Sequence, residues 1–102
     1  MVILSWPILR EFGKKHPSAE RVLLDWFHAV RAENWSSLAD VRLFANSVDY
    51  VGNHRFVFNI RGNHYRLVAA VVFSTRTVYL KFIGTHKEYD LIDASQVEYH
   101  KN

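Results

Sequence analysis

Ionisable side chains follow one another in the stretch IGTHKEYD, residues 83–90, directly after an apolar run. His86 suits proton transfer, because the ordinary pKa of a histidine is about 6.5 and lies near neutral pH. Lys87 places a positive charge beside it, and the phenol of Tyr89 suits stacking on a base or relaying a proton. The stretch predicts chemistry on an anionic substrate if the fold brings further cations beside it.

Positive charge is concentrated in the middle of the chain. The formal net charge is only +3, but residues 50–87 contain six Lys or Arg residues and no Asp or Glu. The cations of this block are Arg55, Arg61, Arg66, Arg76, Lys81 and Lys87. Scattered surface cations are common, but a block with cations and no anions favours a surface that binds a polyanion such as RNA.

Length and composition limit the class of protein. A chain of 102 residues predicts a single domain spanning residues 1–102. The absence of cysteine excludes a disulfide framework, a thiolate nucleophile and a cysteine zinc site, and it fits a reducing compartment. The apolar run LVAAVVF at 67–73 is too short to cross a bilayer, and the first residues lack the basic region of a signal peptide. We therefore expect a cytoplasmic protein with no membrane partner.

The N-terminal half has the period of helices. Residues 2–4 predict a short strand, and Ser5 is expected to cap a first helix that ends near Gly13. Apolar residues at helical spacing predict an amphipathic helix over 18–32. The capping-box pattern SLAD predicts a short helical turn over 37–44.

The C-terminal half has the alternating pattern of strands. Runs rich in Val, Phe, Tyr and Ile predict strands over 55–60, 64–73 and 77–84, with a weaker strand over 47–51. The expected fold class is therefore α+β, in the order β-α-α-β-β-β(-β). Two N-terminal helices are expected to pack on one face of a mainly antiparallel sheet.

The first predicted hairpin has a well-specified register. A type II′ turn at Gly62 and Asn63 places Asn59 opposite Arg66. The other face of both strands is then apolar throughout and must meet the helices. A slip of one residue would bury Arg66 instead, so this alternative is disfavoured.

The second predicted hairpin extends the polar face. A turn over 74–77 places Thr85 opposite Arg66 and Lys81 opposite Ala70, with Ile83 on the same open face. The polar residues expected on the open face are Asn59, Arg61, His64, Arg66 and Lys81.

Arg66 is the most informative of these residues because it lies in the middle of a strand. No acid lies on the neighbouring strands in this register, so an anionic ligand is its expected partner. Arg61 and His64 flank the turn, and either solvation or contact with a phosphate would explain them.

The sheet block lacks the residues that several other nuclease chemistries require. A metal-dependent nuclease needs clustered carboxylates to hold Mg²⁺, and residues 50–87 contain none. Strand parity also argues against a zinc site built from His54, His64 and His86. We therefore expect neither a metal nor a cofactor. Cation-assisted phosphoryl transfer on RNA remains, with the 2′-hydroxyl as the nucleophile.

Two segments together resemble a known family. RFVFNIRGNHYRLVAAVVF followed by GTHKEYD resembles the HigB branch of the RelE-like bacterial toxins, most strongly over about residues 54–90. The resemblance implies a RelE-like fold and a metal-independent mRNA endonuclease that commonly cuts messages in the ribosomal A site. It also implies a helix-turn-helix, HigA-like antitoxin as the partner.

The resemblance also assigns roles to residues. It implies that Arg66 holds the scissile phosphate, that His86 and Lys87 lie at the catalytic edge, and that Tyr89 stacks on or orients a nucleotide. For Asn59, Arg61 and Asn63 the resemblance is weaker, and it implies that they contact RNA or form the turn. His64 is an alternative proton shuttle, on geometry alone.

Two other functions fit the charge pattern. A non-catalytic RNA-binding module would use an aromatic sheet face, but only Tyr79 among the strand aromatics is expected on the open face. A subunit that merely docks an acidic partner through its cations is the other alternative. The tail, residues 93–102, supports no prediction.

Overall fold

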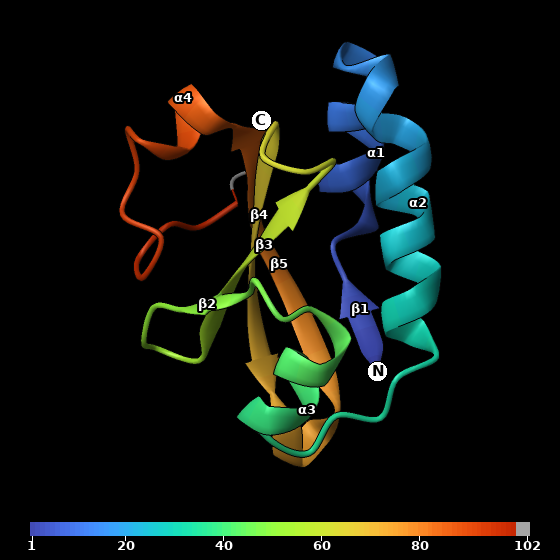
Figure 1. Cartoon of the computed structure of the whole chain (residues 1–102), viewed down its shortest axis with the longest axis vertical. Helices are drawn as coiled ribbons and strands as arrows, with labels where there is room; N and C mark the ends of the chain where they lie inside the picture. Colours follow the sequence, from blue (N-terminus) through green and yellow to red (C-terminus); the bar gives the residue numbers. More distant parts are fainter. Residues whose placement is uncertain (100–102) are drawn as a thin grey trace.

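The sheet lies between helices on one side and a helix with coil on the other (Figure 1). The computed structural model describes residues 1–99, and over these residues the strand order is β1-β5-β4-β3-β2. The strands are β1 (Val2–Leu4), β2 (Asp49–Tyr50), β3 (Arg55–Ile60), β4 (Tyr65–Val72) and β5 (Thr77–Thr85). β1 runs parallel to β5 and the other neighbours are antiparallel. The predicted α+β class and mainly antiparallel sheet are confirmed.

The two long helices, α1 and α2, cover one face of the sheet (Figure 1). The helices are α1 (Trp6–Lys15), α2 (Pro17–Arg31), α3 (Leu38–Phe44) and α4 (His86–Tyr89). Gly13 does not end α1 as predicted but lies buried inside it. A Cβ at Gly13 would lie 3.3 Å from the side chain of Glu20, so the glycine allows α2 to approach closely. Ser5 precedes α1 with a φ of 79°, and its side chain makes no capping hydrogen bond.

The short helix α3 begins where the capping pattern predicts. The Ser37 hydroxyl accepts a hydrogen bond from the Asp40 backbone N–H at 3.4 Å. The Asp40 carboxylate turns to Ser36, whose backbone N–H it accepts at 2.8 Å. Hydrogen bonds from Ser36, first from its backbone N–H and then from its hydroxyl, hold the pKa of Asp40 below its ordinary value.

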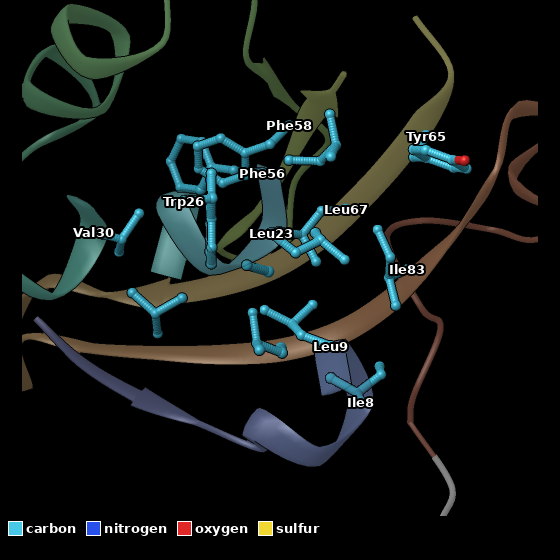
Figure 2. Packing of buried hydrophobic residues seen from close by; sticks show 14 of the residues in the cluster. Ile8, Leu9, Leu23, Trp26, Val30, Phe56, Phe58, Tyr65, Leu67 and Ile83 are labelled. Carbon is cyan, nitrogen blue, oxygen red and sulfur yellow. The ribbon is translucent and has the colours of Figure 1, made fainter. Parts of the chain in front are cut away.

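The main core fills the space between the helices and one face of the sheet (Figure 2). Leu9 and Leu23 supply the helical side of the core, and Phe58 and Leu67 supply the sheet side, each at most 2% exposed. Burying such side chains contributes roughly 1.5–3 kcal/mol each through the hydrophobic effect. The predicted apolar face of the first hairpin is therefore the face that meets the helices.

The first hairpin has the predicted register. Asn59 pairs with Arg66 across β3 and β4. The connection differs from the predicted two-residue turn, because β3 ends at Ile60 and β4 begins at Tyr65, which leaves the four residues 61–64 between them, with Gly62 at a φ of 64°. Arg61 also has a positive φ, 53°, which takes it out of the strand. Arg61 and His64 therefore do not pair in the sheet, although the His64 backbone N–H donates to the Arg61 carbonyl at 3.3 Å.

The predicted register of the second hairpin is wrong. Val71 pairs with Val78 rather than with Leu80, because the chain reverses through a 3₁₀ turn at Phe73–Thr75 and then Arg76, whose φ is 52°. A β-bulge at Lys81 then shifts the pairing by one further residue.

The bulge changes which side chains of β5 face the helices. Ile83 was expected on the open face, but it lies in the main core beside Ile8 and Leu9 (Figure 2). Phe82 lies on the opposite face. Arg66 pairs with Gly84 rather than with Thr85.

Much of the second sheet face is apolar and covered, which corrects the expectation of an open cationic face. Val57 and Val68 are buried there beneath Ala94, with Ile92 and Phe82 packed around them. Residues 90–98, named here the C-terminal segment, follow α4 across this face (Figure 1). Among the predicted polar residues of this face, Asn59 is exposed and Arg66 is half-buried, near the end of the sheet where β5 leads into α4.

The core predicts a sharp difference between two leucines. Leu23→Ala should lower the free energy of unfolding by about 2–5 kcal/mol, because Leu23 is 1% exposed and its removal leaves a cavity. Leu43→Ala is the matched control, since Leu43 is 87% exposed and its truncation should change stability by about 0.5 kcal/mol or less. Urea denaturation measures both, and equal losses would contradict the described core.

Candidate active site

α4 begins immediately after β5 and is fixed there by a capping box. The Thr85 hydroxyl accepts from the Glu88 backbone N–H at 3.2 Å, and the Glu88 carboxylate accepts from the Thr85 backbone N–H at 2.7 Å. His86 is the first residue of the helix, and Lys87 follows it on the surface. The sequence THKEY therefore builds a rigid corner that presents two predicted site residues to solvent.

The two predicted histidines lie side by side at this corner. The His86 backbone N–H donates to the His64 carbonyl at 3.3 Å, which joins the β3–β4 turn to α4. The His86 Nδ1 lies 3.3 Å from an Asp90 carboxylate oxygen, with both side chains at least half exposed. Asp90 thus faces the Nδ1 side of the exposed imidazole rather than its Nε2 side.

Arg66 is half-buried and held from one side by the neighbouring turn. Its guanidinium donates to the Asn63 side-chain oxygen at 2.9 Å and to the Asn63 carbonyl at 3.3 Å. Within residues 1–99 it forms no ion pair with a carboxylate. Asn59 lies opposite Arg66 and is exposed, so an anion that approaches Arg66 meets an amide as well.

Gly84 gives the corner its shape and was not singled out from the sequence. A Cβ at this position would lie 2.5 Å from Cζ of Phe82 and 3.1 Å from Cβ of Glu88. Glycine therefore lets the Phe82 ring and α4 approach β5 directly opposite Arg66. The signal available in the sequence was a lone glycine at the end of a strand pattern.

Tyr89 lies close enough to Arg66 for their charges to interact. Burial of the phenol raises the pKa of Tyr89, the charge of Asp49 raises it further, and the charge of Arg66 lowers it. The Tyr89 phenol is therefore protonated at neutral pH and has a proton to donate to a ligand. Tyr89 also packs against the buried cluster that contains Val57 and Val68.

Asp49 is the acid that sequence reasoning missed. It pairs with Val57 across β2 and β3, so strand alternation places it on the same face as Arg66. Only the weak strand pattern over 47–51 pointed to this placement.

The remaining predicted residues differ in their surroundings. Arg61 and Asn63 are exposed in the β3–β4 turn, beside His64. Lys81 lies at the bulge, and its ammonium binds the Glu98 carboxylate at 2.8 Å. Lys81 is therefore engaged with an acid, unlike the free cation that the predicted register implied.

The part of the chain that the structure describes has neither a cluster of metal ligands nor a helix able to span a membrane. Over residues 1–99, no three His, Asp or Glu side chains gather closely enough to hold a metal ion. None of the helices in the same range combines the length and apolar character needed to cross a membrane.

Comparison with known proteins gives consistent matches. Residues 19–92 match a family described as "HigB_toxin, RelE-like toxic component of a toxin-antitoxin system". An "mRNA interferase toxin HigB" of Escherichia coli K12 is 28% identical over 97 residues, which cover 92% of each chain. An "mRNA interferase HigB" of Shigella flexneri has the same identity and coverage. A further "mRNA interferase HigB", from Escherichia coli O6:H1, is 25% identical over 88% of this chain and 89% of the relative.

The charges around Tyr89 predict how its titration responds to substitution. Asp49→Asn should lower the pKa of Tyr89, because it removes a negative charge that disfavours the phenolate. Arg66→Met should raise the pKa, because it removes a positive charge. NMR titration of ¹³Cζ-labelled tyrosines measures both shifts, with Tyr89→Phe assigning the signal among the five tyrosines. A Tyr89 pKa that is unchanged in both variants would contradict the described arrangement.

Proposed function

The chain belongs to the family of HigB-type, RelE-like toxins of toxin–antitoxin systems, and we propose that it is an mRNA endonuclease. The observation that carries the proposal is the half-buried guanidinium of Arg66. Asn63 orients it, and the described residues supply it with no carboxylate partner. Tyr89 lies near enough for the charge of Arg66 to lower its pKa, and His86 lies at the same corner. The names of the curated relatives, each an mRNA interferase, support the same activity.

We propose that cleavage uses the 2′-hydroxyl of the RNA as its nucleophile and no metal ion. The 2′-oxygen attacks the adjacent phosphorus, and the bond from phosphorus to the 5′-oxygen of the next nucleotide breaks. The protein must then accept one proton, stabilise added negative charge on phosphorus, and give one proton to the leaving oxygen. The products carry a 2′,3′-cyclic phosphate and a 5′-hydroxyl.

Each of these tasks has a suitable side chain at the corner. The planar guanidinium of Arg66 suits two phosphate oxygens at once. His86, oriented by Asp90, is our candidate to accept the proton of the 2′-hydroxyl. Tyr89, like any tyrosine with a pKa of about 10 or above, keeps its proton at neutral pH, and burial raises its pKa further, so it is our candidate to donate to the leaving oxygen.

Further contacts to RNA would come from exposed residues around the corner. Lys87 follows His86 on α4, and Asn59, Arg61 and Asn63 line the other side. These residues suit phosphates and sugars flanking the cut rather than base edges. We assign Lys81 a structural role rather than a contact with RNA, because its ammonium already forms a salt bridge with Glu98.

We infer two partners for the protein. The family description names a toxin–antitoxin system, and a HigA-like antitoxin with a helix-turn-helix is the partner proposed. The ribosome is the second proposed partner. The corner is an open surface whose groups suit phosphates, and such a surface alone would hold a flexible message in many positions. A ribosome that holds the message would supply that positioning.

Arg66 should be essential for toxicity. Arg66→Ala should lower the rate of mRNA cleavage about 100–1000-fold, as loss of one preorganised donor to a developing oxyanion does. Arg66→Lys keeps the charge but not the fork, so its rate should lie between those of the wild type and Arg66→Ala. Arg21→Ala is the control, because Arg21 is 81% exposed on α2, where its partner is Asp25. A folded Arg66→Ala protein that still halts growth and cuts at the wild-type rate would contradict the site.

The ends of the cut message test the nucleophile and the partner together. Incubation with translating ribosomes should leave 2′,3′-cyclic phosphates, and the same message without ribosomes should be cut far more slowly. His86→Ala should remove a limb of the pH–rate profile that His64→Ala retains. Ends with a 3′-hydroxyl and a 5′-phosphate would indicate attack by water and contradict the mechanism.

A further inference from the structure

Arg55 is a buried cation that takes no part in the proposed chemistry. It opens β3, and its side chain is only 4% exposed. Its guanidinium donates to the carbonyl oxygens of Ala94, at 3.3 Å, and Val97, and to the carboxylate of Glu98. Only the two terminal nitrogens are hydrogen-bonded, since the buried Nε has no partner among the described residues, and their bonds hold the C-terminal segment against β3.

Other polar contacts hold the same segment at its margins. Lys81 binds Glu98 from β5 at 2.8 Å, and the Asn53 side-chain amide donates to the Ser95 carbonyl at 3.0 Å. Hydrogen bonds from Lys81 and then Arg55 lower the pKa of Glu98, so its carboxylate is ionised at neutral pH. The segment is thus bound to the loop before β3, to β3 itself and to β5.

The anchored segment forms part of the surroundings of Tyr89. Ala94 is 8% exposed and buries Val57 and Val68 of the sheet, and Tyr89 packs against this same cluster. The Ile92 backbone N–H donates to the Tyr89 carbonyl at 3.2 Å. The apolar cluster therefore links the ring of Tyr89 to a segment that Arg55 holds in place.

We propose that Arg55 is a positioning residue for the cleavage reaction. By binding residues 94–98 to the sheet, it holds the phenol of Tyr89 at the place where it serves the phosphate bound by Arg66. Arg55 itself is sealed from solvent and touches no RNA. The inference rests on the proposed function, and it separates Arg55 from the exposed cations of the same block.

Two variants and one control test this role. Arg55→Met removes the guanidinium, its charge and its hydrogen bonds, and Glu98→Gln keeps the shape of the partner while removing its charge. Val71→Ala is the control, because Val71 is fully buried in the core on the helical side and its truncation destabilises the fold without touching Tyr89. Each variant is assayed on translating ribosomes below its melting temperature, and its tyrosines are titrated by ¹³C NMR.

Loss of positioning should affect catalysis more than binding. We expect Arg55→Met to lower kcat about 10–100-fold, since a misplacement of about 1 Å can cost about that much, with KM changed much less. The pKa of Tyr89 should fall toward its ordinary value of about 10, because the ring loses part of its cover. Glu98→Gln should lower kcat and the pKa of Tyr89 by smaller amounts. Val71→Ala should change neither kcat nor the pKa of Tyr89.

A purely stabilising role gives a different result. If folded Arg55→Met keeps the wild-type kcat and Tyr89 pKa, or if Val71→Ala lowers kcat equally, the proposal is overturned. If Arg55→Met does not fold, Glu98→Gln decides by the same two measurements, and no shift in either overturns the proposal. A wild-type protein that cuts no RNA would refute the proposed function, whereas the titration of Tyr89 would still test whether Arg55 holds the ring.

Discussion

The alternation of side chains across β4 is the constraint on which the site depends. Leu67 is fully buried against the helices, and Arg66, its neighbour, must point the other way. A slip of one residue would put the guanidinium into a core that contains Phe58, where it would have no counter-charge. The cost of burying an unpaired guanidinium therefore holds Arg66 at the second face of the sheet, where α4 begins.

Most of the second face is closed, which confines the proposed site to a small part of it. α1 and α2 cover the first face, and the C-terminal segment covers much of the second with an apolar cluster of its own. What remains is a small corner at which the β3–β4 turn meets the capping box of Thr85. The capping box of Thr85 and the hydrogen bond between the backbones of His86 and His64 join α4 to the β3–β4 turn at that corner, and the proposed stabilisation of a phosphate requires such preorganised groups.

The parts of the fold that the sequence predicted are those with an unambiguous pattern. The first hairpin has one apolar face and a Gly-Asn turn, and both indicate the register that is observed. The second hairpin was misaligned because Phe82 and Ile83 are adjacent and both apolar, so either parity satisfies the pattern. A left-handed residue at Arg76 and a bulge at Lys81 then decide the register, and neither has a distinctive sequence signal.

The prediction of the site was limited because the sequence does not show which charged side chains are buried. Counting cations could not separate Arg55, which is buried, from Arg66, which meets solvent. Glu98, the partner of Arg55, lies in a tail whose sequence has no periodic pattern, so the pairing of these two residues depends on tertiary structure alone. Asp49 was missed because the weak strand pattern over 47–51 does not show with which residue of β3 it pairs, and that pairing decides which face its side chain takes.

A structure of the protein on a ribosome tests most directly whether Arg66 binds the scissile phosphate. The message would carry a 2′-O-methyl group at the cleavage site, so that the nucleophile is blocked and the complex persists. We expect the Arg66 guanidinium within about 3 Å of an oxygen of the phosphate that follows the methylated ribose, with Tyr89 beside the leaving oxygen. A message bound elsewhere on the surface, with Arg66 facing only Asn63 and water, would contradict the proposed site.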